Sequence, residues 1–152
     1  MRPILMRGCV VGVLLASVSA RAQIVPVTQM RSVQVSKSDS YTYRDPMTGM
    51  VTHGSDNPSD SKAAPDFAPF ESSLMVGGGN AADQTSSITP TMVSAIGHAT
   101  GNGSSYGGNY SSNSSSGRGS SSFSLVFDLA STTDIQINGL LNGLTIWPNN
   151  LS

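Results

Sequence analysis

SFSLVFDLASTTDIQINGLL, residues 122–141, has the most sustained strand periodicity in the chain. Large apolar side chains occupy every second position of its first half: Phe123, Leu125, Phe127 and Leu129. This spacing places them on one face of a β-strand. A polar connection, residues 130–133, leads into a second alternating segment over residues 134–138 that ends at Gly139. The pattern predicts a β-hairpin, and because an isolated hairpin is marginally stable, its apolar face needs a second layer.

Other alternating segments can supply that layer. The predicted strands lie at residues 28–36, 70–76, 81–89 and 90–100. The side chains expected to close the core are Phe70, Leu74, Val76, Phe123, Leu125, Phe127, Leu129, Ile135 and Ile137. The predicted fold class is therefore all-β, an antiparallel β-sandwich of jelly-roll type with long flexible loops. Residues 141–152 begin a further strand and then stop, which predicts an incomplete sandwich.

Two segments are expected to lie outside the main strands. Residues 37–66 are rich in Asp, Asn, Gly and Pro, the residues that form turns. Within them, residues 41–43 can pair with residues 49–53 as a small hairpin. Residues 101–122 consist almost entirely of Ser, Gly and Asn. Because such a tract buries little apolar surface, it is expected to be a mobile loop.

Residues 1–22 have the features of a secretory signal peptide. Arg2 and Arg7 form a basic start, residues 8–18 are apolar, and a small-residue site predicts cleavage between Ala22 and Gln23. The apolar run is shorter than the ~20 residues that a spanning helix needs, so no membrane span is expected after cleavage. The chain is therefore expected to be secreted, to the extracellular space, the periplasm or the envelope, with residues 23–152 as one β-sandwich domain.

Charge and cysteine content limit the kinds of partner and of stabilisation. After cleavage the chain keeps 5 basic and 9 acidic residues, a net charge of −4, so nucleic acid is not an expected partner. The single cysteine, Cys9, leaves with the signal peptide. The exported domain must therefore be stabilised by core burial without disulfides.

The residue types of common catalytic and metal sites are sparse. His53 and His98 are the only histidines and have no partner at metal-ligand spacing, so no metal or cofactor is expected. Residues 56–60 carry three oxygen-bearing side chains that could contribute to a calcium site, although their spacing favours a turn. Glycoside hydrolysis needs two acids at one cleft, and Glu71 is the only glutamate, with Asp66 nearby. A non-enzymatic protein is predicted.

Aromatic side chains are the remaining candidates for ligand contact, because they can stack on sugars. The candidates are Tyr41, Tyr43, Tyr106, Tyr110 and Trp147. Tyr106 and Tyr110 lie in the Ser/Gly tract and are expected to be the most exposed. They are the predicted glycan contacts.

Several short motifs also carry a family resemblance. In order they are Gln29-x-Arg31-Ser32, residues 66–71 (DFAPFE), Gln84-x-Ser86-Ser87-Ile88, Ser94-Ala95-x-Gly97, the Ser/Gly tract, and the two alternating segments of residues 122–139. This order resembles exported β-sandwich proteins of the PEP-CTERM-sorted type from planctomycete-like bacteria. The chain departs from that pattern because no Pro-Glu-Pro, apolar span or basic tail follows Ile146. The resemblance implies an extracellular or envelope-associated sandwich linked to exopolysaccharide, and no known reaction.

Two functions follow as hypotheses. The first is a secreted, non-enzymatic structural or interaction protein of the cell envelope or extracellular matrix, with polysaccharide or other envelope proteins as partners. The second is a carbohydrate-binding module that contacts envelope or extracellular polysaccharide through exposed aromatic side chains.

Overall fold

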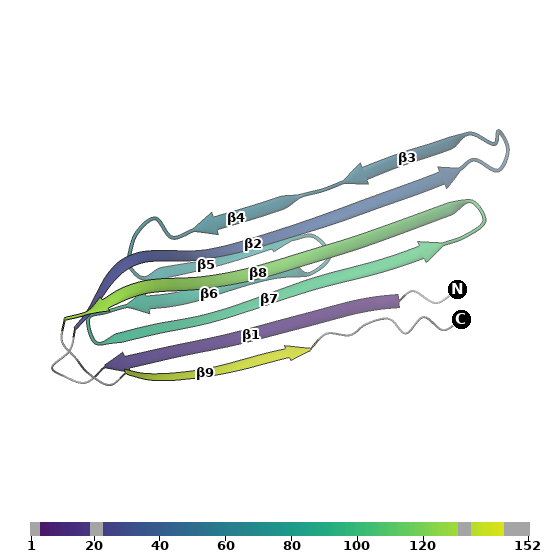
Figure 1. The fold of residues 1–152 in the computed structure, drawn as a ribbon. Helices are drawn as coiled ribbons and strands as arrows, with labels where there is room; N and C mark the ends of the chain where they lie inside the picture. Colours follow the sequence, from purple (N-terminus) through teal and green to yellow (C-terminus); the bar gives the residue numbers. More distant parts are fainter. Residues whose placement is uncertain (1–3, 19–22, 131–134, 145–152) are drawn as a thin grey trace.

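The computed structural model describes residues 4–18, 23–130 and 135–144, and this part of the chain forms strands and turns without a helix. The strands are β1 (Ile4–Val18), β2 (Ile24–Arg44), β3 (Val51–Asp56), β4 (Ser59–Ala63), β5 (Phe70–Val76), β6 (Asn80–Ile88), β7 (Met92–Gly107), β8 (Ser111–Leu129) and β9 (Ile135–Leu144). Figure 1 shows them as one set of nearly aligned strands, of which β1, β2, β7 and β8 are long. The prediction of an all-β fold is confirmed.

All strand pairs are antiparallel, and the main path through the sheet is β3-β2-β8-β7-β1-β9. Strand β4 pairs with β2 beside β3, and β6 pairs with β7 on the edge opposite β1. Strand β5 borders β6. Strands β6 and β8 thus pair with the same edge of β7, β6 along residues 93–100 and β8 along residues 104–107. The sheet therefore divides into two branches along this edge.

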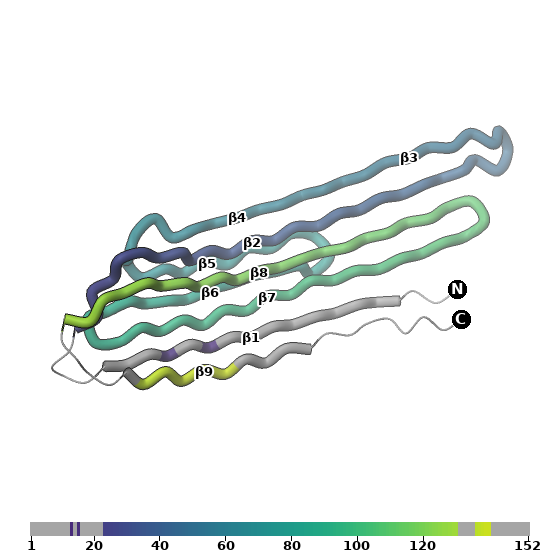
Figure 2. Tube along the Cα trace, viewed as in Figure 1, coloured from purple at the N-terminus to yellow at the C-terminus, as the bar shows by residue number. Residues whose placement is uncertain are grey.

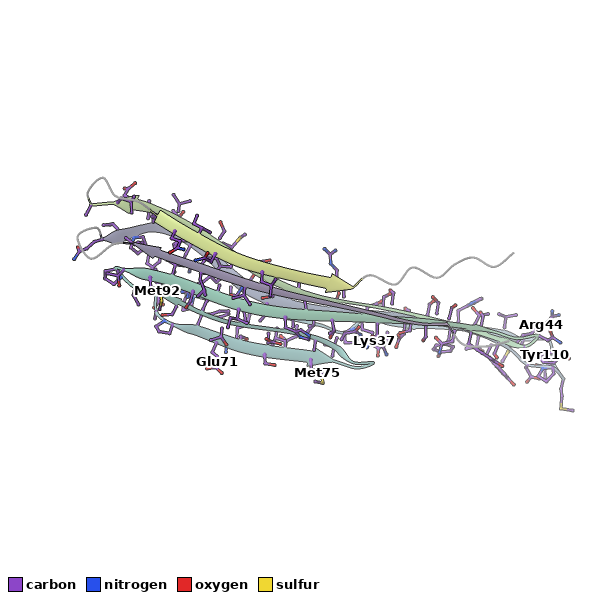
Figure 3. All side chains as sticks on the ribbon, turned by 90° about the horizontal axis from the view of Figure 1, so that it is seen from below. Lys37, Arg44, Glu71, Met75, Met92 and Tyr110 are labelled. Carbon is purple, nitrogen blue, oxygen red and sulfur yellow. The ribbon has the colours of Figure 1, made fainter. Side chains whose placement is uncertain are left out.

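The division lies in the β7–β8 hairpin. These strands pair only near their turn, from Ser104 opposite Ser115 to Gly107 opposite Ser112. Farther from the turn, β8 stays on β2 and β7 stays on β6, so the antiparallel sheet curls back over itself. Figure 3 shows two layers at the end near Met92 and Glu71, merging into one thin layer toward Arg44 and Tyr110. Figure 2 follows the single-layer ribbon of β2, β8 and β7 to its tip.

The prediction of a mobile loop at residues 101–122 is wrong. Residues up to Gly107 continue β7, and from Ser111 onward they form β8, with only a short turn between. Small side chains here allow two backbones to approach closely where the layers separate. A Cβ added at Gly119 would meet the carbonyl oxygens of Ala81 and Thr100, the latter at 2.7 Å. At Gly119, β6 and β7 thus pack directly against the backbone of β8.

The predicted hairpin over residues 122–141 is also wrong in its pairing. Strand β8 pairs with β2, where Ile24 lies opposite Leu129, and β9 pairs with β1. The two alternating segments are real strands, but each finds a partner that is distant in the sequence. Ile137, expected in the core, is 66 % exposed, and the side chain of Ile135 lies outside the described residues.

Among the side chains that the structure describes, two buried clusters form a core on the inner face of the curled sheet. The first contains Ile24 and Val93, with Ile88, Phe123, Leu125, Phe127 and Leu129 packed against them. The second contains Val33, Val35 and Ala82, with Leu74, Val76 and Ala99 packed against them. The predicted inward faces of residues 70–76 and 123–129 are thereby confirmed, since Phe70 is buried as well.

The turn-rich region, residues 37–66, is more regular than predicted. Strand β2 continues through Arg44, and β3 and β4 pair with it in succession. The predicted small hairpin exists, but its second strand begins at Val51 and not at residue 49, so that Tyr41 lies opposite Gly54 and Tyr43 opposite Thr52. Long strands persist here because residues 39–43 of β2 pair with β8 on one side and with β3 on the other, which outweighs their weak intrinsic strand preference.

The turn between β2 and β3 is stabilised by Asp45. Its Oδ1 accepts hydrogen bonds from the backbone N–H groups of Met47 (2.7 Å) and Thr48 (3.1 Å). These two bonds hold the pKa of Asp45 below its ordinary value, because they favour the charged carboxylate. A depressed folded-state pKa means that the carboxylate stabilises the turn above its ordinary pKa, and that this contribution is lost as the pH falls through the folded value.

We expect acid to loosen this turn, and Asp45→Asn to abolish that pH dependence. The amide retains an acceptor oxygen for Met47 and Thr48 but does not titrate. Amide hydrogen exchange of residues 46–50 across the acidic range measures the effect. Equal acid sensitivity in the wild type and in Asp45→Asn would show that another group controls the turn.

Residues 4–18 form β1, which lies between β7 and β9. Cleavage before Gln23 stays a prediction, and Ala22 lies outside the described residues. In the described part of the chain, no helix is long and apolar enough to cross a membrane.

Candidate binding face

An uncovered part of the inner face of β2 is the candidate binding surface. Val33 and Val35 point inward and are covered by the β5–β6 hairpin. Tyr41 and Tyr43 share their face, because side chains of a strand alternate. That hairpin ends at residues 77–79, so the two tyrosines beyond it are exposed, at 50 % and 48 %. Burial and exposure on one strand face are thus set by where the hairpin ends.

Strand register brings a third tyrosine into line with them. Tyr41 lies opposite Asn113 on β8, and Asn113 lies opposite Tyr106 on β7. Directly opposed residues of antiparallel strands project to the same side, so the three form a row across the ribbon. Two strand spacings separate the tyrosine backbones, a span of roughly 10 Å. We call Tyr41, Tyr43, Tyr106 and Asn113 the tyrosine face.

A glycine on the neighbouring strand positions the Tyr41 ring. Gly54 of β3 lies opposite Tyr41, and a Cβ added at Gly54 would overlap the outer edge of the ring and its hydroxyl. The absence of a side chain there lets the ring extend over β3 instead of standing away from the sheet. The tyrosine face therefore reaches across four strands.

Charges beside the tyrosine face are paired. Lys37 and Asp39, the two preceding residues on the same face of β2, form an ion pair. Hydrogen bonds from Lys37 and then Ser115 hold the pKa of Asp39 below its ordinary value. Figure 3 shows Lys37 near the end of the two-layer part of the molecule. The aromatic rings of the tyrosine face therefore lie next to an ion pair, Lys37 and Asp39, that has no net charge.

The end of the β5–β6 hairpin is fixed by two asparagines. Asn80, buried to 1 % exposure, donates from Nδ2 to the carbonyl of Gly77 (2.8 Å) and accepts at Oδ1 from the backbone N–H of Asn102 (2.7 Å). Asn102 Nδ2 donates to the carbonyl of Gly78 (2.7 Å). These hydrogen bonds connect the turn at residues 77–79 to β7. They therefore determine where the β5–β6 hairpin ends and where the uncovered part of β2 begins.

Arg31 is a second buried polar centre, at the opposite end of the β5–β6 hairpin. Its side chain is 1 % exposed and donates to Gln29 Oε1 (3.0 Å), Ser86 Oγ (3.3 Å) and the backbone carbonyls of Asp66 and Ala68, the latter at 2.8 Å. Burial lowers its pKa, while the nearby Asp66 charge acts in the opposite direction.

The guanidinium of Arg31 also lies over the Phe70 ring, 5.8 Å from its centre. Strand β2, the loop before β5, and β6 are therefore joined through one side chain. These contacts assign Arg31 a structural role, because its Nε, Nη1 and Nη2 atoms each donate a hydrogen bond to another residue of the chain. Three of the sequence motifs quoted above, around Arg31, Phe70 and Ser86, meet at this point.

The other candidate residues are dispersed. Thr42 Oγ1 lies 3.0 Å from His53 Nδ1, on the face opposite the tyrosines, and His98 Nδ1 lies 3.3 Å from Asp83 Oδ1. Glu71 is exposed on β5 and points away from the layers in Figure 3. The described residues contain no group of three or more His, Cys, Asp or Glu arranged to hold a metal ion.

The two predicted glycan contacts occupy different places. Tyr106 belongs to the tyrosine face, whereas Tyr110 lies in the turn between β7 and β8, where its carbonyl accepts from the N–H of Arg44 (2.7 Å). Both are 54 % exposed, and Trp147 lies outside the described residues. The sequence did not reveal that Tyr41 and Tyr106 share a row, because that depends on how β2, β8 and β7 pair.

Comparison with protein-family models, curated proteins and solved structures finds no match.

Proposed function

We propose that the chain is an exported, non-enzymatic structural or interaction protein of the cell envelope or extracellular matrix, in which the curled sheet serves as a sandwich-like base. The observation that supports this is the division of the sheet into a two-layer base and a single-layer ribbon. The base carries the buried clusters and the Arg31 and Asn80 networks. The ribbon carries exposed tyrosines on a regular hydrogen-bonded support, which suits presentation of a contact surface away from the core.

A second candidate function is carbohydrate binding, and the tyrosine face favours it. Aromatic rings spaced across a flat strand surface can stack on successive sugar rings, while amide and hydroxyl groups nearby can bond to sugar hydroxyls. Tyr41 and Tyr106 supply the rings, and Asn113 lies between them. The ligand class is an extended envelope or extracellular polysaccharide.

Binding to an array of such polysaccharides tests this function. We expect saturable binding that falls at least tenfold in Tyr41→Ala and in Tyr106→Ala, because each removes one stacking ring. Tyr110→Ala is the matched control, an equally exposed tyrosine outside the row, and should bind like the wild type. Loss in Tyr110→Ala with retention in the other two variants would contradict the tyrosine face as the site. Absence of binding across the array would leave the structural role alone.

A further inference from the structure

The edge of β7 that faces β1 is covered only by the N-terminal strand in the part of the chain that the structure describes. Strand β1 pairs with β7 over nearly its whole length, from Ile4 opposite Ser105 to Ser17 opposite Met92. On its other side, β1 is the pairing partner of β9. Removal of residues 1–22, the predicted signal peptide, would therefore take a complete strand out of the sheet and leave the β7 edge without this partner.

The exposed edge would lack the usual protection against strand pairing. Residues 92–107 contain no Lys, Arg, Asp, Glu or Pro, the residues that commonly block edge-to-edge association. The opposite border of the sheet differs, because β3 and β4 are short, are separated at Asn57 and Pro58, and carry Asp56, Asp60 and Lys62. Among the sheet edges that the structure describes in full, the β7 edge differs in three ways. It is long, it carries no Lys, Arg, Asp or Glu, and it is covered by a strand that the predicted cleavage removes.

Strand direction favours a second copy of the chain over β9 as the replacement for β1. Strands β7 and β9 are both antiparallel to β1, so β9 runs parallel to β7 and would have to reverse to reproduce the observed pairing. A twofold axis, in contrast, places two β7 strands of equal length antiparallel to each other. The second β7 strand can then bond to the same backbone groups that β1 bonds to in this structure.

We infer that removal of residues 1–22 converts the β7 edge into a homodimer contact, in which β7 of one copy pairs antiparallel with β7 of another. The two curled sheets then join into one continuous sheet across the twofold axis. The inference goes beyond the proposed function and rests on the predicted cleavage, not on the tyrosine face. Ligand binding at that face and dimer formation are independent measurements.

The test uses the full chain with a specific protease site in place of residues 19–22. The protein is purified uncut and then cleaved, and its mass is measured before and after by light scattering on a sizing column. We expect release of the N-terminal fragment and a twofold rise in the mass of the remaining particle. Ile96→Lys, which places a charge on the half-exposed outer face of β7, should prevent the rise.

Met75→Lys is the matched control, because Met75 is an exposed apolar residue on β5, away from the β7 edge. It should leave the rise in mass unchanged. The inference is overturned if the cleaved chain releases the fragment but keeps its mass, if the fragment stays bound, or if Met75→Lys and Ile96→Lys act alike. Each of these outcomes would mean that the β7 edge does not join two copies.

Discussion

The Gly119→Ala substitution should lower the free energy of unfolding by about 3 kcal/mol, because the added methyl group has no space between two layers of backbone. Its Cβ would meet the carbonyl oxygens of Ala81 on β6 and Thr100 on β7. Neither oxygen can move alone, since the two strands are hydrogen-bonded to each other. The methyl group would therefore force the β6–β7 layer away from β8. Urea unfolding of the full chain measures the loss.

Gly107→Ala is the matched control within the same Ser/Gly tract. A Cβ at Gly107 would meet no heavy atom within 4 Å, and its φ is not in the left-handed region. Alanine there should be neutral or slightly stabilising, because it restricts the unfolded chain. If both substitutions were equally harmless, the tract would not pack against β6 and β7.

Arg31→Ala should also lower the free energy of unfolding by about 3 kcal/mol, because buried acceptors would lose their donors. The affected groups include the backbone carbonyls of Asp66 and Ala68, which receive hydrogen bonds from the guanidinium. Removal of the side chain also leaves a cavity beneath the Phe70 ring. The loss should appear as a lower urea midpoint.

Two other variants separate the causes of this loss. Arg31→Lys keeps the charge but cannot reproduce the planar set of donors, so it should be intermediate. Arg118→Ala removes an exposed arginine on β8 and should change stability by less than about 0.5 kcal/mol. Equal stability of Arg31→Ala and Arg118→Ala would contradict the structural role of Arg31.

Strand positions with alternating apolar residues could be predicted from the sequence because their signal is local. Phe123 and Leu125 on β8, like Val33 and Val35 on β2, face the core as their period of two requires. The small hairpin around Asp45 was predictable for the same reason, since both its strands and its turn lie within a few residues. Local patterns thus fixed which face of each strand is buried.

Strand partners and the role of the Ser/Gly tract could not be predicted, because they depend on residues distant in the sequence. The need for glycine at position 119 comes from Ala81 and Thr100, and no local pattern shows that contact. The tyrosine face has the same origin, because Tyr41 and Tyr106 are aligned by their shared neighbour Asn113. A composition that indicates a loop in isolation instead forms strands when neighbouring strands pair with its backbone along its length.

The pairing of β2 with β8 also has a consequence for the order of folding. Ile24, at the start of β2, pairs with Leu129, at the end of β8. The ladder between β2 and β8 can therefore be completed only after nearly all of the described chain has been exported. Local hairpins, β5–β6 and β2–β3, can form early, whereas this closure has high contact order and should be slow. During that interval β2 presents a long, unpaired edge, so successful folding after export depends on closing this ladder before two unfinished chains meet.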